Sequence, residues 1–238
     1  MNDAAAGSDA VLDLANPEAL AETAADLIAR ALAAALDRAG RASLAVAGGT
    51  TPAQTYRRLS AAPLDWARID IVPTDERWAP PSSPDSNERF LRETLLQGPA
   101  AAARFTALWS DAPTPQAAAA RAEPLIAALV PFDAVVLGMG EDGHFASLFP
   151  GSSALADGLD PDGPRLCVGA PAGSPAPPQP RISLTLRAFE HGRDIFLLIT
   201  GDAKRRVLDD AWSGGRDLPV RALRGLGGEA VRVLWAPL

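Results

Sequence analysis

Cysteine and histidine are scarce in this sequence of 238 residues, which contains one cysteine and two histidines. Cys167 alone excludes an intrachain disulfide and a cysteine-based zinc site, and neither His144 nor His191 has a second histidine at helical spacing. No stretch approaches the ~20 apolar residues of a membrane span. Residues 1–10 lack the basic and apolar parts of a signal peptide. We therefore expect a cytoplasmic protein that has no cysteine- or histidine-based metal site and no membrane partner.

Basic residues are outnumbered as well, with 22 Lys and Arg against 29 Asp and Glu and a formal net charge of −7. They are scattered along the chain, so no basic stripe for nucleic-acid phosphates is visible and no nucleic-acid partner is expected. A small anionic ligand remains compatible with this balance, because local fields can oppose the net charge. No long linker divides the chain, so we expect one domain over residues 1–238, present as a monomer or weak homodimer.

Short apolar runs alternate with helical patterns along the chain. The first helix is expected at 17–39, after the capping residue Asn16 and before Gly40. We expect further helices at 53–59, 87–96, 117–129 and 204–212, and strands at 43–47, 69–72, 133–137, 181–186, 195–199 and 231–235. Residues 74–85 and the Pro-rich residues 170–180 are interpreted as loops. This alternation predicts an α/β fold with an open, mainly parallel, Rossmann-like sheet and helices on both faces.

Two glycines and two threonines follow the first predicted strand. In Gly48, Gly49, Thr50 and Thr51, the glycines let the backbone approach an anion closely and the threonines add hydroxyl donors, with a helix starting just after Pro52. The segment is not a P-loop, because the Lys-Ser/Thr ending is missing, and it lacks the GxGxxG spacing of dinucleotide sites. It suits a phosphate, although by itself it fits a tight strand-to-helix turn equally well.

Three more predicted strands are followed by polar groups. Asp75 and Arg77 come after the second strand, Asp142 and His144 lie in a glycine-rich loop after the third, and Lys204 follows the strand at 195–199. Ligands of open α/β sheets bind beyond the carboxyl ends of the strands, so these loops are expected to converge on one edge. Taken singly, each group has an ordinary interpretation, namely a surface ion pair, a structural or solvated histidine and an exposed lysine.

These segments together resemble the 6-phosphogluconolactonases and, more distantly, the glucosamine-6-phosphate deaminase/isomerases that share their fold. The resemblance covers most of the chain between residues 44 and 208. It rests on the stretches LAVAGGTTP (44–52), PTDERWAP (73–80), PDSNERF (84–90), VVLGMGEDGHFASLFPGS (135–152), PRISLT (180–185) and ITGDAKRRVL (199–208). It implies hydrolysis of 6-phospho-D-glucono-1,5-lactone, a step of the oxidative pentose phosphate pathway, without metal or cofactor.

The resemblance also implies roles for single residues. His144 matches the general base, Arg77 an active-site arginine and Asp75 an active-site acid, and either Asp142 or Asp75 would orient the imidazole. The implied phosphate-binding residues are Gly48, Gly49, Thr50, Thr51, Lys204 and Arg181.

The chain departs from the family pattern at two positions near these motifs. Ala47 stands where serine is common, which removes one hydroxyl donor near the phosphate turn. Phe145 stands where threonine commonly follows the catalytic histidine, so we expect a change in pocket polarity. The segment after Gly225 matches the family weakly.

Two other functions stay open. A deaminase/isomerase needs an added acid after the histidine loop, and residues 145–149 contain none, which favours the lactonase. A non-catalytic sugar-phosphate-binding regulator would carry a DNA-binding segment, whereas the roughly 40 residues before the first motif read as one helix without a basic face.

Overall fold

The computed structural model describes residues 11–171, 178–224, 226 and 231–238. In this part of the chain seven parallel strands form one sheet, in the order β1 (Val11–Asp13), β10 (Arg232–Ala236), β9 (Asp194–Thr200), β6 (Ala134–Gly138), β2 (Ala42–Val46), β3 (Ile69–Pro73) and β5 (Arg104–Phe105). The α/β class and the mainly parallel sheet predicted from the sequence are confirmed.

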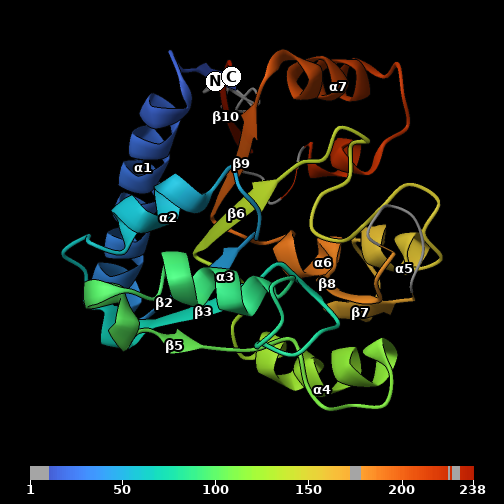
Figure 1. Cartoon of the computed structure of the whole chain (residues 1–238), viewed down its shortest axis with the longest axis horizontal. Helices are drawn as coiled ribbons and strands as arrows, with labels where there is room; N and C mark the ends of the chain where they lie inside the picture. Colours follow the sequence, from blue (N-terminus) through green and yellow to red (C-terminus); the bar gives the residue numbers. More distant parts are fainter. Residues whose placement is uncertain (1–10, 172–177, 225, 227–230) are drawn as a thin grey trace, which may run out of the picture.

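Helices cover both faces of this sheet. They are α1 (Pro17–Ala39), α2 (Ala53–Leu59), α3 (Asn87–Thr94), α4 (Pro115–Ala127), α5 (Leu155–Leu159), α6 (Leu186–Phe189) and α7 (Asp202–Ser213), with 3₁₀ turns η1 (Trp66–Arg68), η2 (Gly98–Ala102) and η3 (Pro219–Leu223). In Figure 1, α1 and α2 lie on one side of the strands and α5, α6 and α7 on the other.

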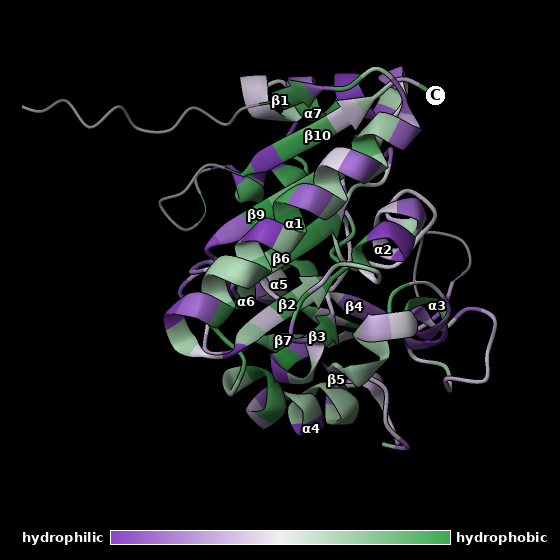
Figure 2. Cartoon of the chain, turned by 90° about the vertical axis from the view of Figure 1, so that its left-hand side faces the viewer, coloured by the Kyte–Doolittle hydropathy of each residue, from purple (hydrophilic) through white to green (hydrophobic). Residues whose placement is uncertain are grey.

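Alternate side chains of the central strands pack into two separate hydrophobic cores, one on each face of the sheet. In β6, Ala134 and Val136 pack with α1 and α2, whereas Val135 and Leu137 pack on the opposite face with α4 and α7. Both sets are fully buried, which explains why the parallel strands read as continuous apolar runs. In Figure 2 the central strands are mainly apolar, whereas α1, which lies in front of them, carries both polar and apolar residues.

The capping residues at both ends of α1 determine its bounds, Pro17–Ala39, as predicted from the sequence. The Asn16 side chain accepts a hydrogen bond from the backbone N–H of Ala19, and Gly40 ends the helix with a φ of 70°. Helix α1 is also long, yet no helix among the described residues is both long and apolar enough to cross a membrane.

Two assignments made from the sequence are wrong. The expected loop at 74–85 contains β4 (Asp75–Arg77), and the expected strand at 181–186 ends earlier, because Leu186 begins α6. Among the described residues, three antiparallel strands form a second sheet in the order β4, β8 (Arg181–Leu184) and β7 (Cys167–Ala170). Strand β4 is short and consists of three charged residues, so it has no apolar pattern that would predict a strand. Its pairing with β8 alone defines it. In the Pro-rich loop predicted at 170–180, Ala170 ends β7, and residues 172–177 lie outside the described residues.

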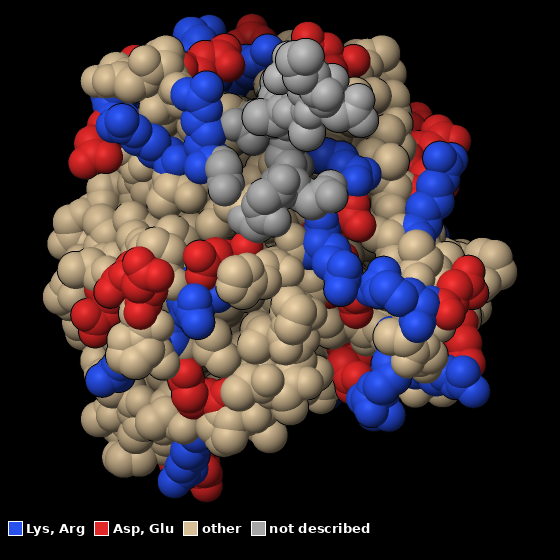
Figure 3. Space-filling model, turned by 180° about the vertical axis from the view of Figure 1, so that it is seen from behind, with Lys and Arg blue, Asp and Glu red and all other residues tan. Residues whose placement is uncertain are grey.

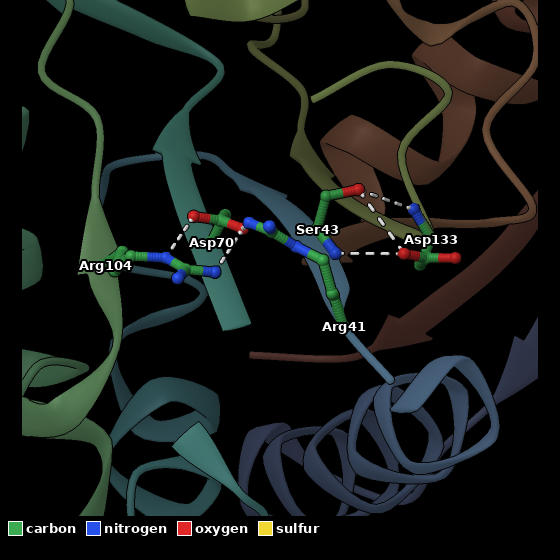
Figure 4. A network of polar contacts seen from close by, with 5 residues as sticks. All are labelled: Arg41, Ser43, Asp70, Arg104 and Asp133. Atoms are coloured by element: carbon green, nitrogen blue, oxygen red, sulfur yellow. Dashed lines mark hydrogen bonds and ion pairs between the residues drawn. The ribbon is translucent and has the colours of Figure 1, made fainter. Parts of the chain in front are cut away.

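A network of charges fastens the strands at the edge of the sheet where they begin (Figure 4). Asp70 on β3 accepts hydrogen bonds from Arg41, at 2.8 Å, and from two nitrogens of Arg104, at 2.7 and 3.0 Å. Beside it, the backbone N–H of Ser43 donates to Asp133 at 3.0 Å, and the Asp133 backbone N–H donates to the Ser43 hydroxyl. Burial opposes ionisation of Asp70, but its two arginine partners hold its pKa below the usual range.

We expect Asp70→Asn to lower the free energy of unfolding by about 1–2 kcal/mol at pH 7, because charge-assisted bonds are lost while both guanidinium groups stay largely solvated. A group with a lowered folded-state pKa stabilises the protein fully above its unfolded pKa, so this contribution begins to decline as the pH falls below about 4 and is lost as the pH passes the lowered folded-state pKa. Urea unfolding of both proteins at pH 7 and pH 3.5 measures it. Equal stabilities at pH 7 would contradict the prediction.

Candidate active site

One pocket of about 240 Å³ opens beyond the carboxyl ends of the central strands. The chain leaves β2 toward β3 on one side, while β6 lies on the other side of β2, so the order of strands reverses here. Such a reversal is where open α/β sheets bind ligands. Every predicted site residue except Asp142 lines this pocket, namely Gly48, Gly49, Thr50, Thr51, Asp75, Arg77, His144, Arg181 and Lys204.

The glycine turn after β2 depends on both of its glycines. A Cβ on Gly48 would lie 2.0 Å from the side-chain oxygen of Asn87, so any side chain there would displace the Asn87 amide group. Gly49 has a φ of +101°, a conformation that residues with a Cβ rarely adopt. The turn is anchored from below, because the Tyr56 hydroxyl donates to the Ala47 carbonyl at 2.7 Å. Its backbone is therefore exposed to the pocket and held in place.

Glu76, next to the predicted Asp75 and Arg77, is fully buried and organises this corner of the site. Its carboxylate accepts the backbone N–H groups of Arg77, Asn87 and Glu88 at 2.7–2.8 Å and the Ser86 hydroxyl at 3.1 Å. Burial raises the pKa of Glu76 to about 7, and the hydrogen bonds from Asn87 and Glu88 oppose this rise. The interpretation of this segment as a surface ion pair is therefore wrong for Glu76, which is buried and accepts the first backbone N–H groups of α3.

Asn87, at the start of α3, joins the predicted residues of this corner. Its amide group donates to the Asp75 carbonyl at 2.7 Å, and its oxygen accepts a hydrogen bond from Arg77 at 2.7 Å. Arg77 also donates to the Asp85 carbonyl at 2.9 Å, so its guanidinium is fixed at the pocket wall. Sequence reasoning did not assign Asn87, although the family stretch at 84–90 contains it.

His144 is held by its own loop. Its Nδ1 lies 2.5 Å from a carboxylate oxygen of Asp142, which also accepts the His144 backbone N–H at 3.2 Å. Partial burial opposes ionisation of Asp142, but the hydrogen bond from His144 lowers its pKa below the usual range. A Cβ on Gly140 would lie 2.2 Å from the imidazole, which explains a glycine at that position. With Nδ1 bonded to the carboxylate, Nε2 is the nitrogen left for proton transfer.

Of the two acids considered as partners of His144, only Asp142 contacts it. The carboxylate of Asp75 instead accepts hydrogen bonds from the Ser147 hydroxyl, at 2.5 Å, and the Thr74 hydroxyl, at 3.2 Å. Asp75 still lines the pocket, so it faces the ligand space rather than the imidazole.

Phe149 packs between two of the predicted groups. Its ring centroid lies 4.1 Å from that of His144, and the Arg181 guanidinium carbon lies 5.1 Å from it. Arg181 reaches the pocket from β8, and burial is the main cause of its lowered pKa. From the sequence, Phe149 was considered only as part of residues 145–149, which contain no acidic residue, and it was not assigned to the site.

Lys204 enters the pocket from the first turn of α7. No described residue forms a hydrogen bond or an ion pair with its ammonium group, which is about half-buried. Burial lowers the pKa of Lys204, and the charge of Glu141 opposes that shift. A cation near a helix N-terminus is destabilised by the dipole, so an anionic ligand would offset both costs.

The two departures from the family pattern have different consequences. Ala47 lines the pocket, so the absent hydroxyl changes the pocket wall. Phe145 is fully buried, with its ring 6.4 Å from Phe189, and does not line the pocket. The expected change in pocket polarity through Phe145 is therefore wrong, because the side chain points into the core.

Other features bear on the remaining expectations. His191 lies outside the pocket with 69% of its side chain exposed, as its solvated interpretation requires. The described residues contain no group of three or more His, Cys, Asp or Glu that could hold a metal ion. On the face shown in Figure 3, basic and acidic side chains lie interspersed.

Comparison with known proteins agrees with the resemblance seen in the sequence. A model of the glucosamine-6-phosphate isomerases/6-phosphogluconolactonase family matches residues 15–235, extending past Gly225. The chain is 41% identical to a 6-phosphogluconolactonase of Rhizobium meliloti over 93% of this chain and 96% of that protein. It is 42% identical to one of Caulobacter vibrioides, over 92% and 94% of the two chains.

Solved structures show the same relationship. A 6-phosphogluconolactonase from Shewanella baltica superposes with a TM-score of 0.88 at 35% identity, covering 97% of this chain and 99% of that one. A monomeric glucosamine-6-phosphate deaminase, at 22% identity and a TM-score of 0.75, shares the fold over 95% and 96% of the two chains. The chain therefore belongs to the glucosamine-6-phosphate isomerase/6-phosphogluconolactonase family.

Proposed function

We propose that this enzyme hydrolyses 6-phospho-D-glucono-1,5-lactone to 6-phospho-D-gluconate, with His144 as the general base. The observation that carries the proposal is that the imidazole, the glycine turn and the ammonium of Lys204 line one pocket. The relatives at about 40% identity are 6-phosphogluconolactonases, which supports the same substrate for this chain.

The phosphate of the lactone binds first in this mechanism. The backbone of residues 48–51 and the ammonium of Lys204 anchor it, and Arg181 adds a second positive charge to the pocket. This anchor fixes the ring so that its carbonyl carbon, C1, faces His144. Holding the reacting atoms together in this way removes much of the entropic cost of the reaction.

The chemical step needs no covalent intermediate, because the δ-lactone is strained and electrophilic. Nε2 of His144 takes a proton from water while Asp142 stabilises the imidazolium through Nδ1, and the hydroxide attacks C1. Arg77 stabilises the developing oxyanion, a role worth about 3–4 kcal/mol when one donor is lost. His144 then returns the proton to the departing ring oxygen as the C1–O bond breaks.

An assay of proton release on freshly generated lactone, corrected for spontaneous hydrolysis, tests this function. We expect a rate far above the spontaneous one and no ammonia release from glucosamine 6-phosphate. A rate equal to the spontaneous one would refute the lactonase assignment, and ammonia release would favour the deaminase.

Lys204→Ala should raise KM about 10- to 100-fold and change kcat little, because a charge-assisted bond to the phosphate is lost in ground state and transition state alike. Steady-state kinetics on the lactone measure this split. Arg206→Ala is the matched control, since it removes an exposed positive charge from the same helix. An unchanged KM in Lys204→Ala would count against phosphate anchoring by this residue.

Some expectations from the sequence accompany the proposal and stay predictions. They are a cytoplasmic location, a monomer or weak homodimer, and the lack of a nucleic-acid partner. A single catalytic domain is supported by the pocket itself, whose lining residues run from Ala47 to Lys204.

A further inference from the structure

The carboxylate of Asp75 faces the pocket with unused hydrogen-bonding capacity. It is 7% exposed and accepts the hydroxyls of Ser147 and Thr74. No described residue forms an ion pair with it, and a carboxylate offers about four lone-pair sites. The pocket therefore presents a fixed, negatively charged acceptor that suits a neutral donor such as a hydroxyl group.

The order of strands separates this acceptor from Lys204, the lysine of the proposed phosphate anchor. Lys204 follows β9, His144 follows β6, the glycine turn follows β2 and Asp75 follows β3, and these strands are neighbours in that order. Asp75 thus lies on the far side of the glycine turn from Lys204. With the phosphate bound toward Lys204, as proposed above, a carboxylate at this position lies on the side of the sugar ring.

Ser147 ties this carboxylate to the loop of the general base. Its side chain is fully buried three residues after His144, and its hydroxyl proton is donated to Asp75 at 2.5 Å. Its backbone N–H donates to the Ser183 hydroxyl at 3.2 Å, which fixes it against β8. Between His144 and Ser147, Ala146 lines the pocket with a φ of 47°, a strained conformation that the surrounding contacts must maintain.

We propose that Asp75 accepts a hydrogen bond from the 2-hydroxyl of the lactone, and that Ser147 is a positioning residue that holds this carboxylate in place. The inference rests on the proposed function, in which C1 faces His144. The 2-hydroxyl is on the carbon next to C1, and Asp75 accepts a hydrogen bond from Ser147, which belongs to the same loop as His144. The pair would make the enzyme specific for lactones that carry this hydroxyl.

The test compares two substrates made freshly by enzymatic oxidation of glucose 6-phosphate and of 2-deoxyglucose 6-phosphate. We expect the wild type to favour the natural lactone in kcat/KM by about 10- to 100-fold, as the loss of a charge-assisted hydrogen bond would cause. In Ser147→Ala and Asp75→Asn the natural lactone should lose most of this advantage, while kcat/KM for the 2-deoxy lactone changes little.

The ratio between substrates separates specificity from general damage. A purely structural role would lower both rates equally and leave the ratio at its wild-type value, which would overturn the proposal. So would a wild type that does not discriminate. Should Asp75→Asn not fold, Ser147→Ala alone decides. Failure of the lactonase function itself would be seen earlier, as a wild-type rate no higher than spontaneous hydrolysis.

Ser43→Ala provides a matched control. Ser43 also lies beside a carboxylate, that of Asp133 (Figure 4), but the two residues stand where β2 and β6 begin, at the opposite end of these strands from the pocket. We expect this variant to keep the wild-type preference between the two lactones.

Discussion

Replacing His144 with alanine is expected to lower kcat for lactone hydrolysis by about 10²–10⁴-fold, the usual effect of losing a general base. The imidazole is the pocket group placed to take a proton from water, because Asp142 holds its Nδ1 at 2.5 Å and leaves Nε2 for proton transfer. KM should change little, because the phosphate anchor is untouched. Proton release from freshly made lactone measures both constants.

Folding should survive this substitution. The side chains of His144 and Asp142 are 26% and 42% exposed. Removing the imidazole therefore leaves the Asp142 carboxylate partly exposed to solvent and not deeply buried without a partner. His191→Ala is the matched control, because that histidine is 69% exposed and lies outside the pocket. Near-normal turnover in a folded His144→Ala protein would remove His144 from the mechanism.

Glu76→Gln should lower the free energy of unfolding by about 1–2 kcal/mol at pH 8, because the lost hydrogen bonds outweigh the cost of burying the carboxylate. That same cost raises the pKa of Glu76 to about 7, so the stability of the wild type, unlike that of the variant, should fall as the pH rises toward this value. The two carboxylate oxygens accept four donors, three of them backbone N–H groups that cannot turn away. A glutamine side chain would direct its NH₂ group at one pair of these donors. The loss is measured as a shift of the urea midpoint in equilibrium unfolding.

The same change should disturb catalysis, because Glu76 caps the helix that carries Asn87 and bonds the backbone of Arg77. We expect kcat/KM to fall even in the folded fraction. Glu93→Gln is the control on the same helix, and its exposed ion pair with Arg89 should contribute less than about 0.5 kcal/mol. An unchanged urea midpoint for Glu76→Gln would show that the four hydrogen bonds add no net stability.

Features set by neighbouring residues were predictable. The first helix follows from Asn16 and Gly40, and the central strands follow from apolar runs that only a sheet covered on both faces can bury. The gathering of four loops at one edge follows as well, since parallel strands bring their carboxyl ends together. The pocket places His144, the glycine turn and Lys204 together as that rule requires.

Features set by pairing between distant segments were not predictable. Strand β4 was missed because Asp75, Glu76 and Arg77 are polar, and only their register with β8 makes them a strand. The direction of Phe145 into the core had no local signal either, since an aromatic residue beside a glycine-rich loop fits a pocket wall equally well.

By itself, the amino-acid sequence determined the α/β class, the family and most of the polar groups that meet in the pocket, because periodicity, capping and motif order are properties of the chain taken in order. Only the tertiary structure decided that Asp142 and not Asp75 contacts the imidazole, and that Ser147 holds Asp75. In the sequence, both acids belong to motifs that are expected at the same end of the sheet as His144. Which carboxylate reaches which donor depends on how β4, β8 and the histidine loop pack, and such distances are fixed by the fold as a whole.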